Sequence, residues 1–385
     1  MALDALRGVA AIVVLVHHVA MTAPSISAAY SSGGNVPLFS AARWVTLSPL
    51  KILFAGPEFV LVFFVLSGFV LVLTPLRRLP GSYDWLGYYP KRIIRLAIPV
   101  IVSVGLAAIW ITLVPRTSDA TAGAWMVRQG NPDLGLSSLL REASIVGYTG
   151  RPDINPPLWS LAWEMWFSLL LPVGVILAVA TRRFTLAWVV ALLAASTTGY
   201  LFSIEPLMYL PAFGLGALLA ANQQRLVDAG AALSAKRYGT AVWVGISLLG
   251  PALLIAHWLL RPLLTAPFTD LALAMRVPGA VLIVATVALW PPMQRMLSGR
   301  LLAWLGAISF SLYLVHFPVV VSFGEIFGPS RWWMGALISV PLSLVLAQLM
   351  YRWVELPAQT LAGKVGAAVS ATRTRARPRE TVPEP

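Results

Sequence analysis

The chain has 385 residues, of which 58% are hydrophobic and 11% charged, a balance that excludes an ordinary soluble globular protein of this length. It contains no cysteine, which excludes disulfides, thiolate nucleophiles and cysteine-bound zinc, and its four histidines leave little room for a histidine-rich metal site. The formal net charge of +13 is compatible with nucleic-acid binding, but basic residues between apolar segments usually report membrane orientation. We therefore predict an all-α, polytopic integral membrane protein that binds a lipid bilayer, no nucleic acid and no metal.

Apolar stretches of the length that spans a bilayer, about 20 residues, recur along the whole chain. Ten stretches qualify, near residues 6–24, 54–75, 93–114, 157–180, 184–202, 205–221, 239–260, 271–290, 301–323 and 332–355. The first resembles a signal peptide in its apolar length, but Asp4 precedes it and many similar segments follow it. We therefore expect a retained first helix and about ten transmembrane helices, with no clear internal repeat.

The distribution of basic residues predicts the orientation of these helices. With the N-terminus inside, the inner segments hold roughly twice as many Lys and Arg residues as the outer loops, so both termini are expected in the cytoplasm. Residues 1–360 are predicted to form one membrane domain, and the basic residues 361–385 a disordered cytoplasmic tail. The long connections 24–53 and 115–156 are predicted outside, either as a lid over an outward-facing pocket or as ordinary solvated loops.

The first stretch carries Arg7 near one end and His17 and His18 at the other. Ionisable side chains within a span are costly, so each needs a partner or a function. At about 100° and 1.5 Å per residue, His18 lies within roughly 20° of Arg7 around the helix and roughly 16 Å along it, whereas His17 lies about 80° away. A snorkelling Arg7, with His18 bonded to a neighbouring helix, is the structural alternative.

The fourth stretch, PPLWSLAWEMWFSLLLP, carries a carboxylate at Glu164. Ser160 and Ser168 flank it at i−4 and i+4, which makes a polar ridge on an otherwise apolar helix. We expect Glu164 to reach a depth similar to that of His18, where a carboxylate that holds one imidazole nitrogen leaves the other as a general base. A Glu164 that only bonds to another helix is the alternative.

Two further clusters combine polar groups at helical spacing. In YYPKRIIRLAIP, Arg92 and Arg95 lie on neighbouring turns and are predicted to bind a phosphate, whereas Lys91 alone is explained by the positive-inside rule. In ISFSLYLVHFPVV, Ser309, Tyr313 and His316 follow i, i+4, i+7 spacing, which is typical of groups that line a cavity or hold helices together.

Two charged pairs near helix ends are expected to be structural. They are Asp270 with Arg276, and Arg352 with Glu355, which we predict to satisfy each other or to anchor the ends of their helices.

Five motifs, in order along nearly the whole chain, resemble the acyltransferase 3 family of integral-membrane O-acyltransferases. They are LDALRG with Arg7 followed by His18, FFVLSGF at 63–69, KRIIRLAIP at 91–99, LWSLAWEMWF at 158–167 and ISFSLYLVHFP at 308–318. The resemblance implies a ten-helix core that moves an acyl group from cytoplasmic acyl-coenzyme A to a hydroxyl of a sugar or glycosylated product. It also implies that Arg7 and His18 are an essential pair and that the arginines after the second span receive the coenzyme's phosphates.

The chain departs from the family pattern at Ser168, where relatives often have tyrosine. This puts a role for an aromatic side chain at that position in doubt. We also expect no fused carbohydrate-handling domain, which makes a small acceptor such as a macrolide sugar as plausible as a cell-envelope polysaccharide.

The resemblance and the residue patterns together predict a site without a permanently bound cofactor, in which acyl-CoA is a co-substrate. The predicted catalytic residues are His18 as general base, Glu164 as its orienting group and Arg7. The predicted substrate-binding residues are Lys91, Arg92 and Arg95 for the phosphates, and Trp159, Tyr313 and His316 for the acceptor or the oxyanion. Direct transfer and an acyl-histidine intermediate both stay open.

The predicted setting is the plasma membrane of a bacterial cell, with an acetyl or another short acyl group as the moiety transferred. The main alternative is a proton-coupled transporter or flippase, in which intramembrane His and Glu relay protons and the arginines bind an anionic cargo. A non-catalytic membrane scaffold is a third. The sequence assigns neither the acyl chain, the acceptor nor the oligomeric state.

Overall fold

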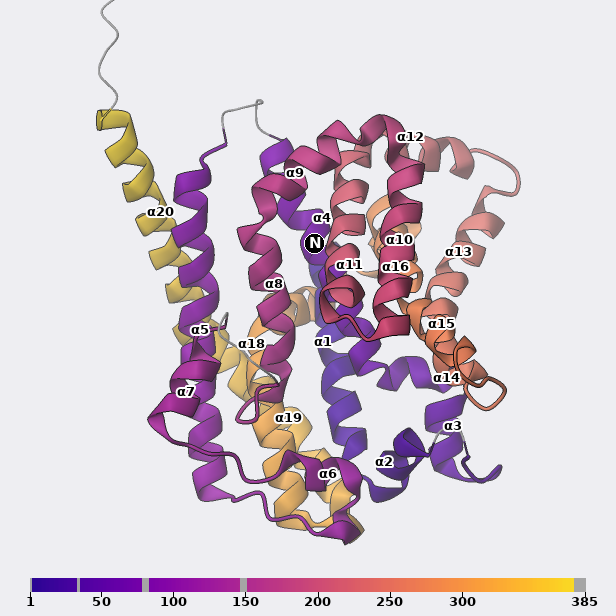
Figure 1. Ribbon diagram of the computed structural model, residues 1–385, viewed down its shortest axis with the longest axis vertical. Helices are drawn as coiled ribbons and strands as arrows, with labels where there is room; N and C mark the ends of the chain where they lie inside the picture. Colours follow the sequence, from indigo (N-terminus) through magenta and orange to yellow (C-terminus); the bar gives the residue numbers. More distant parts are fainter. Residues whose placement is uncertain (1, 33–34, 78–82, 146–150, 377–385) are drawn as a thin grey trace, which may run out of the picture.

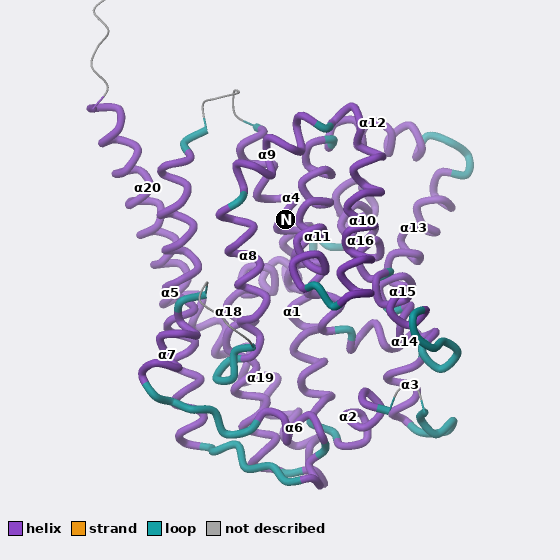
Figure 2. Tube along the Cα trace, in the orientation of Figure 1, coloured by secondary structure: helices purple, strands orange, loops and turns teal. Residues whose placement is uncertain are grey.

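The computed structural model describes residues 2–32, 35–77, 83–145 and 151–376. Over these residues it consists of helices and loops, with no strand (Figure 2). Most of the helices stand side by side along the long axis of the molecule (Figure 1). The expected all-α class is confirmed for the described part of the chain.

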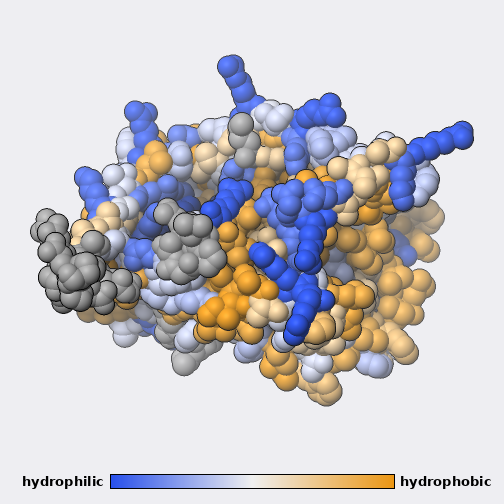
Figure 3. All heavy atoms as spheres, turned by 90° about the horizontal axis from the view of Figure 1, so that it is seen from above, coloured by the Kyte–Doolittle hydropathy of each residue, from blue (hydrophilic) through white to orange (hydrophobic). Residues whose placement is uncertain are grey.

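The two ends of this bundle differ in what covers them. One end, here called the loop end, carries the short helices α2 (Pro24–Ser31), α3 (Ala41–Leu47) and α6 (Ala124–Gln129) (Figure 1). The opposite end, here called the tail end, carries α12 (Gln223–Ser234) and the last turns of α20 (Leu356–Ala376). Viewed from the tail end, the molecule shows many hydrophilic side chains over this face and apolar side chains along part of its edge (Figure 3).

Seven helices or continuous helical runs among the described residues are long and apolar enough to cross a membrane. They are α1 (Ala2–Met21), α4 (Gly56–Leu76), α5 (Trp85–Leu113), η4 with α10 (Arg182–Phe202), α15 with α16 (Phe268–Leu289), α18 (Arg300–Phe327) and the run from η5 into α20 (Pro329–Thr372). The composite runs contain η4 (Arg182–Phe184), α10 (Thr185–Phe202), α15 (Phe268–Ala274), α16 (Arg276–Leu289), η5 (Pro329–Arg331), α19 (Trp332–Met350) and the π-helical η6 (Tyr351–Glu355). The chain is thus a multi-pass membrane protein.

The predicted count of ten spans is not confirmed, although helices cover all ten predicted stretches. The fourth is broken into α8 (Trp159–Leu169) and α9 (Leu171–Ala180), which meet at 63°. Pro172 in the first turn of α9 has no N–H and cannot continue the hydrogen-bond ladder of α8. The sixth and seventh stretches are shorter than a full span, as α11 (Glu205–Ala221) and α13 (Gly239–Leu254).

Short elements connect these helices. They are η1 (Pro49–Phe54), η2 (Ala120–Ala122), α7 (Leu136–Ala143), η3 (Pro156–Leu158), α14 (Ala256–Leu260) and α17 (Pro291–Met296).

Helices α1 and α18 pack against each other as a parallel pair in the core. A Cβ added at Gly8 would lie 2.6 Å from the backbone nitrogen of Gly306, so the two backbones touch there. Ten residues further along each helix, His18 meets His316. Gly8 to His18 on α1 and Gly306 to His316 on α18 are the same number of residues, so the two helices run in the same direction and in register over about 15 Å. The small residues therefore set the distance at which the histidines meet.

Helix α20 corrects the expectation of a disordered tail from residue 361. It runs alongside α5 (Figure 1) as far as Ala376, and residues 377–385 lie outside the described part. Its small side chains allow close packing, because Ala358 and Ala362 are buried. Near its end, Ser370 Oγ donates to the carboxylate of Asp84, which also caps the start of α5. The basic composition of this segment suggested disorder, but its many alanines favour a helix.

The connection between α5 and α8 is clamped over the loop end. Glu142 is fully buried at the end of α7 and accepts hydrogen bonds from the backbone N–H groups of Asp153, Ile154 and Asn155 at 2.6, 2.7 and 3.0 Å. The Arg116 guanidinium donates to the carbonyls of Asp153 and Ile154, at 2.8 Å each. Burial lowers the pKa of Arg116 to about 10, which leaves the group charged at neutral pH.

Asn155 extends this clamp to the core helix α18. Pro318 has no N–H, so it cannot pair with the carbonyl of Leu314 one turn earlier. The side chain of Asn155 donates to that carbonyl at 2.9 Å and satisfies it. The loop end and the second half of α18 are thus held together by a side chain that replaces a helical hydrogen bond.

We expect the close packing of α1 and α18 to be sensitive to a single methyl group. Gly306→Ala places a Cβ against the carbonyl of Asp4 and should lower the free energy of unfolding by about 1–3 kcal/mol. The measurement is thermal unfolding of the purified protein, followed by size-exclusion chromatography. Gly105→Ala is the matched control, because a Cβ there meets nothing within 4 Å and alanine favours the helix. Equal thermal stability of the two variants would contradict the packing argument.

We also expect Glu142→Gln to loosen the clamp, because an amide supplies only one acceptor oxygen to three backbone donors. An unsatisfied buried donor costs about 1–3 kcal/mol, so trypsin should cleave after Arg128 and Arg141 several times faster than in the wild type. Asp133→Asn is the control, since Asp133 is an exposed carboxylate in the same connection. Unchanged cleavage rates in Glu142→Gln would show that the clamp does not hold the loop.

Candidate active site

A cavity of about 800 Å³ reaches from the loop end to His18, within the size range of small-molecule sites. Helix α1 contributes Val14, His17 and His18, which share one face at i, i+3 and i+4 spacing. Helices α4, α8, α11 and α18 supply the other walls, and α6 lies over it. The predicted candidates Trp159 and Tyr313 also line this cavity.

His18 contacts a second histidine from α18 rather than a carboxylate. Its Nδ1 lies 2.9 Å from Nε2 of His316, and Nδ1 of His316 lies 2.9 Å from the carbonyl of Leu312. A carbonyl only accepts, so we assign the proton of His316 to Nδ1, which leaves its Nε2 as an acceptor. His18 must then donate from Nδ1. The neutral His18 ring therefore has an unprotonated Nε2, on the residue that lines the cavity.

Aromatic rings hold the His18 imidazole in this orientation. Trp125 of α6 stacks on it with ring centroids 5.9 Å apart, and Phe317 contacts it edge-on at 5.1 Å. Trp125 is buried and belongs to the connection that the Glu142 clamp holds. Helix α6 thus covers the His18 ring, in agreement with the prediction of a lid for the 115–156 connection.

His17 has different hydrogen-bond partners from those of His18. Its Nδ1 donates to the carbonyl of Phe54 at 3.0 Å, and its ring packs so tightly on Gly56 that a Cβ there would lie 2.7 Å away. Although His17 also lines the cavity, its Nδ1 hydrogen bond ties α1 to η1.

Glu164 does not orient His18, which corrects the expected His18–Glu164 contact. Its carboxylate forms an ion pair with Arg92 of α5, and the Nε of Arg92 also donates to Ser168 Oγ at 2.9 Å. Ser168, the departure from the family pattern, is thus an acceptor for this arginine. The sequence predicted a depth for Glu164 that matched His18, but the carboxylate lies with Arg92 in the tail-end half, and helical spacing could not show which neighbouring helix supplies its partner.

Arg7 and Arg95 lie with Arg92 in the tail-end half, where a second carboxylate joins them. Glu355 lies in the π-helical η6, is buried, and interacts electrostatically with Arg7 and Arg95. It accepts from Ser311 Oγ at 2.6 Å, and this corrects the expected pairing of Glu355 with Arg352. Three arginines and two carboxylates leave a net positive charge in this cluster. Lys91 is exposed at its edge.

Tyr313 lines the cavity close to this cluster. Its hydroxyl lies 2.7 Å from Ser160 Oγ and 3.0 Å from the carbonyl of Pro157, and Glu164 acts on it electrostatically. Tyr313 therefore lines the same cavity as His18 and lies close to a carboxylate of the arginine cluster. The structure brings together His18, His316, Trp159 and Tyr313 at the cavity, and Arg7, Arg92, Arg95 and Glu164 beyond it.

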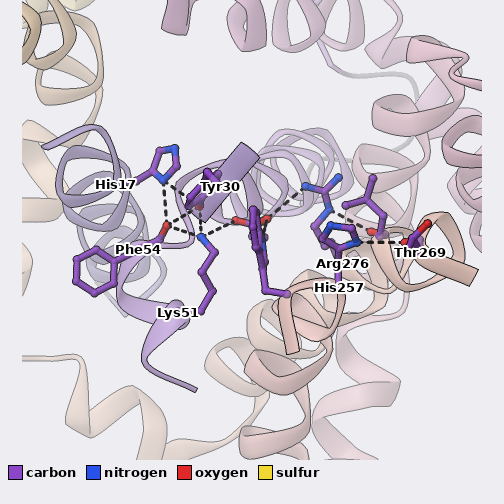
Figure 4. A network of polar contacts seen from close by, with 10 residues as sticks. His17, Tyr30, Lys51, Phe54, His257, Thr269 and Arg276 are labelled. Atoms are coloured by element: carbon purple, nitrogen blue, oxygen red, sulfur yellow. Dashed lines mark hydrogen bonds and ion pairs between the residues drawn. The ribbon is translucent and has the colours of Figure 1, made fainter. Parts of the chain in front are cut away.

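A buried charge network supports the loop end beside the cavity (Figure 4). Lys51 donates to Tyr30 and, at 2.7 Å, to the carbonyl of Phe54, and lies 3.9 Å from Glu58. Burial lowers the pKa of Lys51 to about 8, against the opposing effect of the Glu58 carboxylate. Arg276 reaches Glu58 at 3.4 Å, which corrects its expected pairing with Asp270. This network holds η1, α4 and α16 together.

Comparison with known families identifies the class of protein to which the chain belongs. Residues 2–352 match the model of the acyltransferase domain family Acyl_transf_3. The chain belongs to the acyltransferase 3 family. It is an enzyme that transfers acyl groups, and this excludes the non-catalytic scaffold as its main role.

Two curated relatives carry acyltransferase names. The acyltransferase MdmB of Streptomyces mycarofaciens is 28% identical over 374 residues, which cover 90% of this chain and 89% of that protein. The putative peptidoglycan O-acetyltransferase YrhL of Bacillus subtilis (strain 168) is 24% identical over 340 residues, covering 78% of this chain and 50% of that protein. No solved structure matches significantly.

Sequence reasoning missed several residues of the site. It assigned no role to Trp125, which stacks on His18, and it treated Glu355 as a helix anchor. Trp125 lies in the six-residue helix α6, which is too short to show a periodicity, so no sequence pattern pointed to it. Glu355 carried a signal, since it is a carboxylate next to a predicted span, but its direction depends on the π-helical turn.

Proposed function

We propose that this protein is an acyl-CoA-dependent O-acyltransferase that moves an acetyl or another short acyl group to a hydroxyl of a carbohydrate or glycosylated small molecule. The observation that carries the proposal is the chain of hydrogen bonds from Leu312 through His316 to His18. It leaves His18 Nε2 as an unprotonated base on a residue that lines an 800 Å³ cavity. The names of the two relatives support acyl transfer, and one of them names an oxygen acceptor.

In the proposed reaction, His18 Nε2 takes the proton of the acceptor hydroxyl as its oxygen attacks the thioester carbonyl. The C–O bond forms, the C–S bond breaks, and His18 returns the proton to the departing thiolate, so the products are an ester and free coenzyme A. His316 acts as a positioning residue, because it accepts the Nδ1 hydrogen of His18 and stabilises the imidazolium that forms. Direct transfer needs no other base.

The arginine cluster is the proposed site for the phosphates of the donor. The cluster holds more arginines (Arg7, Arg92 and Arg95) than carboxylates (Glu164 and Glu355). A guanidinium group can donate two parallel hydrogen bonds to the oxygens of one phosphate. Along α1, Arg7 is about 16 Å from His18. A donor bound there must extend its thioester arm past Tyr313 to reach the base. We further propose that the tail end, with Lys91 at its edge, faces the cytoplasm of a bacterial cell.

The acceptor is proposed to enter from the loop end, where the cavity opens. Trp159 and Tyr313, which line it, are the residues proposed to position the acceptor. The two substrates thus approach His18 from opposite ends of the bundle, which fits a transfer from a cytoplasmic donor to an acceptor on the other side of the membrane.

We expect substitutions at His18 and at His316 to affect activity differently. His18→Ala should lower kcat by a factor of about 10²–10⁴, because the base is lost. His316→Gln should retain most of the activity, since its side-chain oxygen can accept from His18 Nδ1, whereas His316→Leu should lose about 10–100-fold. The measurement is acyl transfer from labelled acetyl-CoA by purified protein in lipid nanodiscs, with a panel of glycosides as acceptors.

The pH profile distinguishes positioning from a purely structural role of His316. The rate of the wild type should rise with pH and reach a plateau, because only the neutral base removes the proton. In His316→Leu the midpoint of this rise should shift, whereas a structural defect alone lowers the plateau without moving the midpoint. Wild-type activity of His18→Ala would refute His18 as the base.

We expect Arg95→Gln to raise KM for acetyl-CoA about tenfold while kcat changes little, because one charged contact to phosphate is lost. Acetyl-pantetheine, which lacks the nucleotide phosphates, should show no such increase in KM. Arg352→Gln is the control, since Arg352 is exposed on η6 outside the cluster. An equal rise in KM for both thioesters would place the phosphate site elsewhere.

A further inference from the structure

One face of α8 presents a row of tryptophans to the cavity. Trp159, Trp163 and Trp166 line it at i, i+4 and i+7, with the small Ala162 between them. All four side chains therefore border the open volume of the cavity. Only Trp159 of this row was predicted from the sequence to take part in the site.

Helix α11 extends this row into an aromatic wall. The ring of Tyr209 lies 5.1 Å from that of Trp159 and 5.6 Å from that of Trp163, with interplanar angles of 49° and 47°. Phe64 of α4 contacts both Trp159 and Tyr209 edge-on, at 6.2 and 5.8 Å. The rings hold one another in place before any ligand binds, so little entropy is lost when a ligand stacks on them.

The charges around the cavity cancel. Among the described residues that line it, Arg128 and Arg151 are cationic, and Asp153 and Glu205 are anionic. All four are exposed, so they can rotate to donate or accept hydrogen bonds. A cavity with no net charge gives no electrostatic preference for an anionic or a cationic ligand.

An aromatic belt at the membrane surface is the ordinary explanation for tryptophans in such a chain. A belt tryptophan lies among lipid head groups, however, whereas Trp159 and Trp163 are partly buried and pack on Tyr209 inside the bundle. Their place in the same cavity as His18 links them to the reacting hydroxyl.

We propose that Trp159, Trp163 and Tyr209 form the acceptor subsite and bind an uncharged sugar ring by stacking its C–H face on the indoles, with Arg151 and Glu205 bonded to its hydroxyls. The C–H groups of a sugar ring carry partial positive charge, and an aromatic face is negative, so the two attract. The inference rests on the proposed function for its acceptor class. It adds that the acceptor is a neutral glycoside and that α8 and α11 select it.

Binding can be measured separately from transfer by saturation-transfer difference NMR. The full chain is placed in lipid nanodiscs, because detergents with sugar head groups would compete. The probes are methyl β-D-glucopyranoside and maltose as neutral sugars, methyl β-D-glucuronide as an anionic sugar and glucosamine as a cationic one. We expect the neutral sugars to give the strongest signals, concentrated on the C–H protons of one ring face.

Variants on and off the wall test where this binding occurs. Trp163→Ala should weaken binding of the neutral sugars about tenfold, and Trp163→Phe, which keeps an aromatic face, should retain most of it. Trp188→Ala is the matched control, because Trp188 is 39% exposed on α10 away from the cavity. If Trp163→Ala does not purify as a single species, Tyr209→Leu replaces it in the same comparison.

The two proposals fail in different ways. His18→Ala should lower kcat by the same factor of about 10²–10⁴ and keep the NMR signals. The absence of acyl transfer by the wild type, with intact NMR signals, would overturn the proposed function alone. Stronger signals from either charged sugar, no signal from any sugar, or equal binding by Trp163→Ala and Trp188→Ala would overturn the acceptor subsite.

Discussion

The structure depends on the close, parallel contact of α1 with α18. Gly8 and Gly306 let the two backbones touch in the tail-end half, and the equal step along both helices then brings His18 to His316. Small residues are the usual means of close helix contact where lipid, rather than water, surrounds the bundle. The contact of the two histidines follows from this distance, and the Leu312 carbonyl then sets its hydrogen-bond direction and with it the protonation of the proposed base.

The same lipid environment explains why the other ionisable groups occur in paired clusters. Arg92 with Glu164, and Lys51 with Glu58 and Arg276, are each taken out of water and each contact an opposite charge. In our proposal, the first pair and its neighbours Arg7 and Arg95 lie towards the donor, and the net positive charge of this cluster binds phosphates. The second holds the loop end beside the cavity. Pairing thus serves stability at one end and, in our proposal, substrate binding at the other.

The sequence predicted positions along single helices better than contacts between different helices. His18, His316 and Tyr313 were identified from spacing along single helices and Trp159 from the family motif, and all four line or border one cavity. The predicted partner of Glu164 was wrong, because helical spacing gives the face on which a side chain lies but not the neighbouring helix that it contacts. The helical continuation past residue 361 was missed, since a basic composition outweighed the helix propensity of its alanines.

The sequence by itself determined that the protein is helical and crosses a membrane, because the scarcity of charge and the length of the apolar stretches are local properties. It also determined the family, through motifs that can be read along the chain. Only the tertiary structure decided that His316, and not Glu164, holds His18, and that the tryptophans of α8 face the cavity. These contacts join residues far apart in the chain, and their geometry depends on how the helices pack.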